Sequence, residues 1–533
     1  MKVFSKTLIF SHRYLGIAIS ALVVVWFGSG IVMMYAGGMP RLAPETRLER
    51  IGEIDTSRVQ LTLAEAAEKA GFDASAGWGG GRVVLLSVMD RPAYRFGNEA
   101  TVFADTGEVL DQVSLDQAQT IATAFMRLPE DKLRYVRTLT DVDQWTLNER
   151  RNMPQYKFAA DDGLGTELYV AASNGEVSML STSRARTLAY LGVIPHWLYF
   201  TPLRVQQPIW YDIMVWTSTL ACVLAVIGIV IGFIKFRWTT RPFKLSTAIP
   251  YAGWMRWHYI TGMVFGLFTL TFAFSGLLSM EPYEWTNAEG LQFERDTFTG
   301  GALDFAAFPK VEPAVWSRVA EGRGIKEIDF TRIQDGAYYV VRPTPDPDIE
   351  AKRRERLHQP YNVNGRAEPD TLLVAADTMQ VRHEPFSADS LVARLKTAYP
   401  DVPIVEQQML MDYDDYYYSR GNVTPLPVLR VKFDDPMQTW LYVDPAMSRP
   451  LAAVHRLNRV ERWLFNGLHS LDFSFWYNSR PLWDIVMLVL LGGGLVSSFL
   501  GLYLGIGRMR RGTTRAIAGA GGRGGERSPE PAE

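Results

Sequence analysis

Four long apolar runs constrain this chain of 533 residues more than any other feature of its sequence. The runs contain no charged residue and cover positions 14–40, 213–234, 257–280 and 485–507. At about 1.5 Å of helical rise per residue, each is long enough to cross the roughly 30 Å hydrocarbon core of a bilayer. We therefore expect a membrane protein with a bundle of four transmembrane helices.

Basic residues near the ends of these runs predict the orientation, because Lys and Arg beside a membrane helix stay on the cytoplasmic side. They occur before the first run, in the link 235–256, which has no acidic residue, and after position 507. Both termini and the link are therefore expected in the cytoplasm. The long segments 41–207 and 281–480 are expected outside, in the periplasm of a bacterium. The first run lacks a convincing small-residue cleavage site and is interpreted as a retained anchor.

Turn signals and alternating apolar residues predict that both outer segments are α+β. In the first of them, Leu61–Ala70 and Gln117–Met126 are expected to be helices, and Val83–Ser87 and Tyr156–Ala160 to be strands. Thr101–Leu110 is expected to form two strands joined by a turn at Thr106-Gly107. The predicted parts are the cytoplasmic N-terminus with span one (1–40), outer domain one (41–207), span two (208–236), the cytoplasmic link (237–256), span three (257–280), outer domain two (281–480), span four (481–507) and a disordered cytoplasmic tail (508–533).

The second half of the chain repeats the first. Leu168-Tyr169-Val170 recurs as Leu441-Tyr442-Val443, 273 positions later. The repeated positions near the spans are His12 with His258, Gly16 with Gly262, Ser29-Gly30 with Ser275-Gly276, and His196 with His469. We therefore expect an internally duplicated protein in which each copy has a span, an outer domain, a histidine segment and a second span.

Cysteine usage and glycine patterns exclude several kinds of redox site. The single cysteine, Cys222, lies inside the second run, which excludes disulfides, Cys-ligated iron–sulfur clusters and covalent C-x-x-C-H haem attachment. Gly77–Gly81 lacks a following helix, and Gly492–Gly494 lies within the fourth run. Neither predicts a phosphate-binding turn, so nicotinamide and flavin have no visible site.

Four of the seven histidines occupy the repeated positions near span ends. A twofold arrangement of the copies would place His12 opposite His258 at the cytoplasmic edge and His196 opposite His469 at the periplasmic edge. Facing imidazoles are what a b-type haem requires on its two axial positions. The alternative for any single histidine is an interfacial side chain with one hydrogen bond. The repeated pattern predicts two haem b groups with these four residues as iron ligands.

Residues beside these histidines are expected to complete the cofactor sites. Arg13 and Arg256 are expected to meet haem propionates at the cytoplasmic level, and Arg204 and Arg480 at the periplasmic level. The repeated glycines would leave room for a flat macrocycle between helices. The remaining histidines have no repeated partner and are expected on solvated surface: His358, His383 and His455.

An aromatic and acidic stretch, Asp412–Tyr418, aligns with Asp141–Trp145 of the first copy. Tyrosines combine apolar area with a hydroxyl, which suits a bulky polar ligand or a protein partner. A strand with a packed aromatic face is the alternative. The predicted substrate contacts are Tyr416, Tyr417 and Tyr418, together with Trp197 beside His196.

The opening Ser11–Gly16, the Asp105–Val109 hairpin, Asp414–Tyr418 and Asn466–His469, with the four-span plan, resemble the PepSY-associated transmembrane proteins of bacterial inner membranes. That family includes iron-regulated members and ferric-siderophore reductases. The resemblance covers nearly the whole chain except the tail. It implies PepSY-like outer domains and a ferric siderophore as the electron acceptor.

These observations predict a di-haem electron carrier of the inner membrane. Electrons would pass through the bilayer from quinol or another donor on the cytoplasmic side to a periplasmic acceptor. The family resemblance implies that this acceptor is a ferric siderophore and that the protein is a ferric-siderophore reductase. No nucleic-acid partner is expected. The alternative is a non-enzymatic, membrane-anchored PepSY module that binds or senses a ligand without a cofactor. The four-histidine pattern distinguishes the two, because a sensor has no need of it.

Overall fold

The computed structural model describes residues 2–73, 78, 81–238, 245–287, 290–345, 371–418, 424–477 and 479–521. The chain forms two compact units, each described here by itself. The helical unit comprises residues 1–38, 188–285 and 461–533, and the sheet unit comprises residues 39–187 and 286–460.

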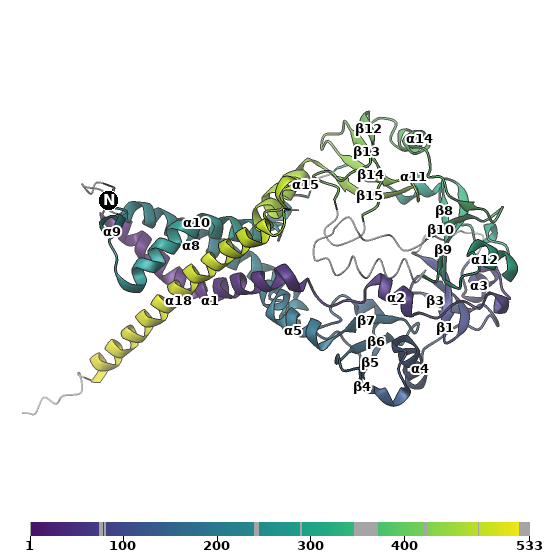
Figure 1. Cartoon of the computed structure of the whole chain (residues 1–533), viewed down its shortest axis with the longest axis horizontal. Coiled ribbons are helices and arrows are strands. Elements are labelled where there is room, and N and C mark those ends of the chain that lie inside the picture. The colour runs from purple at the N-terminus through teal and green to yellow at the C-terminus, as the bar shows by residue number, and fades with distance from the viewer. Residues whose placement is uncertain are drawn as a thin grey trace, which may run out of the picture. The chain divides into compact units, whose positions relative to one another are not determined.

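Four long helices form the helical unit: α1 (Lys2–Ala36), α8 (Gln207–Lys235), α10 (Gly253–Leu278) and α18 (Leu482–Gly521) (Figure 1). Within the described residues, these four are long and apolar enough to cross a membrane. They coincide with the four predicted spans, so the chain is a multi-pass membrane protein. Each helix begins before its apolar run, because the polar residues that flank the run continue the helical hydrogen bonding.

The long helices pack as a four-membered bundle. Helices α1 and α10 each contact both α8 and α18, which places α1 and α10 at opposite corners. The core contains Ile19, Val23, Phe27, Ala221, Phe272, Trp483, Met487, Leu490 and Leu491. The glycine run in α18 serves this packing, since a methyl group at Gly494 would overlap the Phe27 ring and one at Gly493 would overlap the Phe265 ring.

Short helices complete the helical pattern of the chain. They are α2 (Pro44–Arg50), η1 (Thr56–Arg58), α3 (Leu63–Lys69), α4 (Leu115–Met126), η2 (Glu130–Lys132), η3 (Arg150–Asn152), α5 (Ser183–Leu191), α6 (Val193–Trp197), α7 (Thr201–Arg204), α9 (Leu245–Ala248), η4 (Pro282–Glu284), α11 (Arg295–Thr299), η5 (Phe305–Ala307), α12 (Pro313–Val319), α14 (Ala388–Ala398), α15 (Arg456–Glu461), η7 (Arg462–Gly467), α16 (Leu468–Ser470) and α17 (Ser474–Tyr477). Element η7 is a π-helix, a wide turn that often adjoins functional sites.

A seven-stranded sheet joins the two outer segments of the sequence within the sheet unit. Its strands, in spatial order, are β11 (Val381–Arg382), β10 (Leu372–Ala375), β9 (Gly336–Pro343), β8 (Ile325–Ile333), β1 (Val83–Val88), β2 (Arg91–Phe96) and β3 (Ala100–Phe103). The two segments meet where β1 pairs antiparallel with β8, with Leu85 opposite Ile328. Both side chains are buried in one continuous core.

Two four-stranded antiparallel sheets, each covered by one helix, complete the sheet unit. The first has β4 (Leu133–Leu139), β5 (Gln155–Ala160), β6 (Glu167–Ala171) and β7 (Val177–Ser181), and the second has β12 (Ile404–Leu410), β13 (Val428–Phe433), β14 (Trp440–Asp444) and β15 (Arg449–Val454). Helix α4 packs on the first sheet through Ala118 and Phe125, and α14 on the second through Leu391 and Leu395. The predicted α+β class of this part is confirmed.

Two predicted details differ from the structure. Thr101–Leu110 was expected to form two strands, but β3 ends at Phe103 and only an isolated bridge joins Val102 to Val109. The turn closes when Gly107 N–H donates to the Phe103 carbonyl, and the returning Val109 is exposed, so little drives a longer pairing. Helix α18 continues to Gly521, into the predicted tail; positions 522–533 lie outside the described residues.

A buried charge network lies on the seven-stranded sheet. Glu327, with a side chain only 3% exposed, accepts bonds of 2.6 Å from both Arg47 and Arg82. Arg47 also pairs with Glu176, and Arg82 with Asp329. Burial would raise the pKa of Glu327, but the two guanidinium groups outweigh it and hold the pKa at about 2. The network therefore contributes to folding only while Glu327 is ionised.

Candidate functional site

The helical unit brings the four repeated histidines together as two pairs. His12 on α1 and His258 on α10 have ring centres 6.3 Å apart. His196 on α6 and His469 on α16 have ring centres 6.2 Å apart. Ser29, which contacts His196, follows His12 by seventeen residues on α1, or roughly 25 Å along the helix. The pairs therefore lie near opposite ends of α1.

Hydrogen bonds define the protonation of the first pair. His12 Nδ1 lies 3.2 Å from the Leu224 carbonyl oxygen of α8, and His258 Nδ1 lies 3.1 Å from the Ser497 carbonyl oxygen of α18. A carbonyl oxygen only accepts, so each Nδ1 must have the proton. Each Nε2 then keeps its lone pair, which is the state required of a metal ligand.

In the second pair, serine hydroxyls instead of backbone carbonyls lie next to each Nδ1. His196 Nδ1 lies 3.0 Å from Ser29 Oγ, and His469 Nδ1 lies 3.0 Å from Ser275 Oγ. Each serine already donates its one proton to a carbonyl of its own helix, with Ser29 Oγ 2.6 Å from the Val25 oxygen. Towards the imidazole the hydroxyl therefore accepts, and Nε2 again keeps the lone pair.

The separation of the rings fits one metal ion between each pair. An imidazole nitrogen binds a first-row metal at about 2 Å, and the centre of the five-membered ring lies beyond that nitrogen. Two such ligands on opposite sides of one ion give about 6 Å between ring centres, in agreement with both pairs. Within the described residues, no group of three or more His, Cys, Asp or Glu could hold a metal ion. Haem needs only two protein ligands, because the macrocycle supplies the others.

Glycines face all four imidazoles. A Cβ at Gly228 of α8 would lie 2.8 Å from His12 Cε1, and one at Gly501 of α18 would lie 3.2 Å from His258 Cε1. Sequence reasoning missed both, although they stand 273 positions apart, the same interval as His196 and His469. The predicted glycines Gly30 and Gly276 face His196 and His469, at 3.7 and 3.6 Å from the respective Cε1 atoms.

The other two predicted glycines lie beside different groups. A Cβ at Gly16 would lie 3.7 Å from Ser20 Oγ, and one at Gly262 would lie 3.8 Å from Ser497 Oγ. They therefore adjoin the surroundings of the first pair without facing a histidine.

The four predicted arginines differ in their surroundings. Arg13 and Arg256 are half-buried, and within the described residues neither forms an ion pair. Arg204 lies 4.5 Å over the Trp210 ring, and its buried Nε has no hydrogen-bond partner in the described part of the chain. Arg480 already pairs with Asp484 at 2.7 Å. A propionate at Arg480 would compete with that carboxylate, and the role of all four arginines stays a prediction.

The tyrosine stretch packs inside the sheet unit. Tyr417 is 4% exposed, stacks on Tyr442 with ring centres 4.9 Å apart, and donates to the Pro425 carbonyl. Tyr416 lies edge-on to Trp440. Burial and the nearby Asp414 carboxylate raise the pKa of Tyr442. Tyr416 and Tyr417 therefore pack against aromatic side chains of the sheet unit.

The remaining predicted substrate contacts are more accessible. Tyr418 is half-buried, and Trp197, in the helical unit, is 40% exposed beside Tyr199. Whether Tyr416, Tyr417, Tyr418 and Trp197 contact a substrate stays a prediction.

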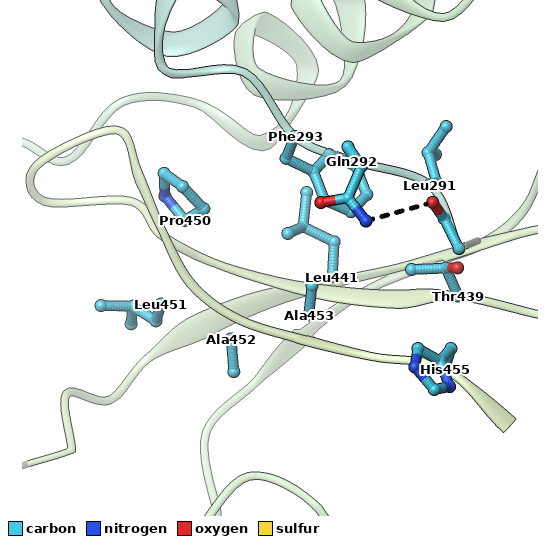
Figure 2. Close-up of a pocket in the computed structure, with 11 residues that line it drawn as sticks. Leu291, Gln292, Phe293, Thr439, Leu441, Pro450, Leu451, Ala452, Ala453 and His455 are labelled. Atoms are coloured by element: carbon cyan, nitrogen blue, oxygen red, sulfur yellow. Dashed lines mark hydrogen bonds between the residues drawn. The ribbon is translucent and has the colours of Figure 1, made fainter. Parts of the chain in front are cut away.

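A cavity of about 340 Å³ lies in the sheet unit along β14 and β15 (Figure 2). Thr439, Leu441 and His455 lie on one side, and the segment 290–293 on the other. Burial and the neighbouring Arg459 lower the pKa of His455. His455 is half-buried, unlike the solvated residue expected, and His358 lies outside the described residues.

More than half of the chain is similar to a known protein family. A family model described as the PepSY-associated TM region matches residues 11–317, more than half of the chain. The matched region includes His12, His196 and His258. No curated protein matches this chain.

Proposed function

Because this chain belongs to the family of the PepSY-associated TM region, we propose that it is a di-haem electron carrier of the bacterial inner membrane. It accepts electrons from quinol or another donor on the cytoplasmic side and passes them to a periplasmic acceptor. The acceptor is ferric iron held by a siderophore, so the protein is a ferric-siderophore reductase.

The observation that supports this proposal most strongly is the geometry of the two histidine pairs. Each pair presents two Nε2 lone pairs, with ring centres 6.3 or 6.2 Å apart. His12 and His258 would hold one haem b, and His196 and His469 the other. An isolated structural histidine has no need of a partner at this spacing, and the same spacing occurs twice.

The chain's own residues supply ligands, orientation and insulation. A bound haem supplies one-electron transfer between its ferric and ferrous states. The Nδ1 hydrogen bonds keep each imidazole in one tautomer and one orientation. The apolar bundle core around Phe27 and Phe272 keeps water away from the region between the pairs.

The siderophore is the substrate in this proposal. One electron converts its ferric ion to the ferrous ion, which a hard, oxygen-rich chelator binds less tightly. The iron is then released without cleavage of the chelator.

Orientation and duplication belong to the same proposal. Basic residues near both termini and in the link 235–256 support a cytoplasmic location for these parts and a periplasmic location for the sheet unit. Duplication is supported by contacts that recur at an interval of 273: the acceptors Leu224 and Ser497, and the facing glycines Gly228 and Gly501.

Single-turnover reduction in lipid nanodiscs tests the proposal. Quinol is added with a ferric hydroxamate siderophore, and a ferrous-specific chelator reports the product. The unchanged protein should form ferrous iron. His196→Ala and His469→Ala should still show donor reduction of the remaining haem but form no ferrous iron. His455→Ala is the matched control, because His455 has no repeated counterpart and belongs to neither histidine pair. Wild-type rates of ferrous iron formation in both outer-pair variants would refute the proposed direction.

A further inference from the structure

We propose that Ser29 and Ser275 are positioning residues that set the reduction potential of the haem held by His196 and His469. This inference rests on the function proposed above. The two serine hydroxyls contact the proposed ligands His196 and His469 and would act through them.

The contacts of the two serines are equivalent. Ser29 is 4% exposed and Ser275 is fully buried. Each Oγ lies 3.0 Å from a histidine Nδ1. Each also donates to the carbonyl four residues earlier in its own helix, at 2.6 Å for Ser29 and 2.7 Å for Ser275. The hydroxyl is therefore fixed with its lone pairs towards the imidazole.

The two histidine pairs differ in the chemistry of this acceptor. His12 and His258 donate to backbone carbonyls, which no substitution removes. His196 and His469 donate to serine hydroxyls, which a single substitution can change, and the Trp26 carbonyl is a further hydrogen-bond partner of His196. The reduction potential of only one of the two sites is therefore adjustable through the side chain bonded to its ligands.

The direction of the effect follows from the charge on the iron. An acceptor at Nδ1 draws the proton away from the ring and makes Nε2 a stronger electron donor, which stabilises the ferric state. Loss of the hydroxyl removes this acceptor and makes the surroundings less polar. Both changes favour the ferrous state, so the potential of this haem should rise.

Potentiometric titration of purified protein, followed by haem absorbance, tests the inference. The unchanged protein should give two waves, and His12→Ala should retain only the wave of the His196–His469 haem. Ser29→Ala and Ser275→Ala should move that wave to higher potential and leave the other in place. Ser29→Thr keeps a hydroxyl and should restore the original value. The matched control is Ser20→Ala, since Ser20 is a buried serine of α1 that donates to the Gly16 carbonyl and, within the described residues, contacts no histidine.

The outcomes separate this inference from the proposed function. Two waves in the unchanged protein that stay in place in both alanine variants would overturn the role of the serines alone. Equal movement of both waves, or the same movement in Ser20→Ala, would also overturn it, because the effect would then be general. A preparation without haem would overturn the proposed function and this inference together.

Discussion

Replacement of Gly228 by alanine should remove one haem from the protein without unfolding it. The added Cβ would lie 2.8 Å from His12 Cε1, whereas carbon atoms in contact ordinarily lie about 3.5 Å or more apart. The imidazole must therefore move by about 0.7 Å, several times the roughly 0.2 Å tolerance of a metal–ligand distance. Alanine in place of a helical glycine ordinarily adds up to about 1 kcal/mol of stability, so general destabilisation is not expected.

The assay is the haem-to-protein ratio of purified variants, and the structure predicts a graded series. Gly228→Ala should retain about half of the wild-type haem. Gly501→Ala, with a 3.2 Å contact, should weaken binding less, and Gly276→Ala, at 3.6 Å, should retain all of it. Gly28→Ala is the matched control, because no atom lies within 4 Å of its added Cβ. Full haem content and an unaltered spectrum in Gly228→Ala would show that His12 is not a ligand.

Further predictions concern the pairing and the charge network. Spectra of His12→Ala and His258→Ala should lack the same haem, and His196→Ala should lack the other; a common loss in His12→Ala and His196→Ala would contradict this pairing. The pKa of Glu327 is about 2 in the folded protein and 4.5 ordinarily. Ionised Glu327 therefore stabilises the folded state by about 3 kcal/mol. This contribution is complete above about pH 4.5 and is lost as the pH falls towards 2. Thermal unfolding of the full chain, followed by strand circular dichroism, should show this decline in the wild type. Glu327→Gln should be less stable at pH 7 and show a flatter profile, and an equally steep profile would refute the role of Glu327.

The spans and the histidine pairs could be predicted because both leave periodic signals in the sequence. Apolar runs of this length indicate membrane-spanning helices, and the recurrence of His12 as His258 and of His196 as His469 indicated which histidines would pair. Ser29 and Ser275 were visible as repeated positions, but their hydrogen bonds to the ligands were not. Those bonds depend on how α6 and α16 pack against the long helices.

Other features of the structure could not be predicted from the sequence. The acceptors at Leu224 and Ser497 are backbone carbonyls, which any residue type could provide. The pairing of β1 with β8 joins strands more than two hundred residues apart, and no turn or motif marks it. Composition left two interpretations of the tyrosine stretch open, and the burial of Tyr417 could not be predicted because it depends on how the stretch packs against Tyr442 of β14.

Cofactor content tests the central claim most directly. Protein purified from the membranes of haem-replete cells should be coloured, with a b-type spectrum that changes when dithionite is added. Acid acetone should extract about two non-covalent haems per chain, because each pair of histidines holds one. A colourless protein, or one whose haem content is unchanged after all four histidines are replaced, would contradict the account and favour a binding or sensing module without a cofactor.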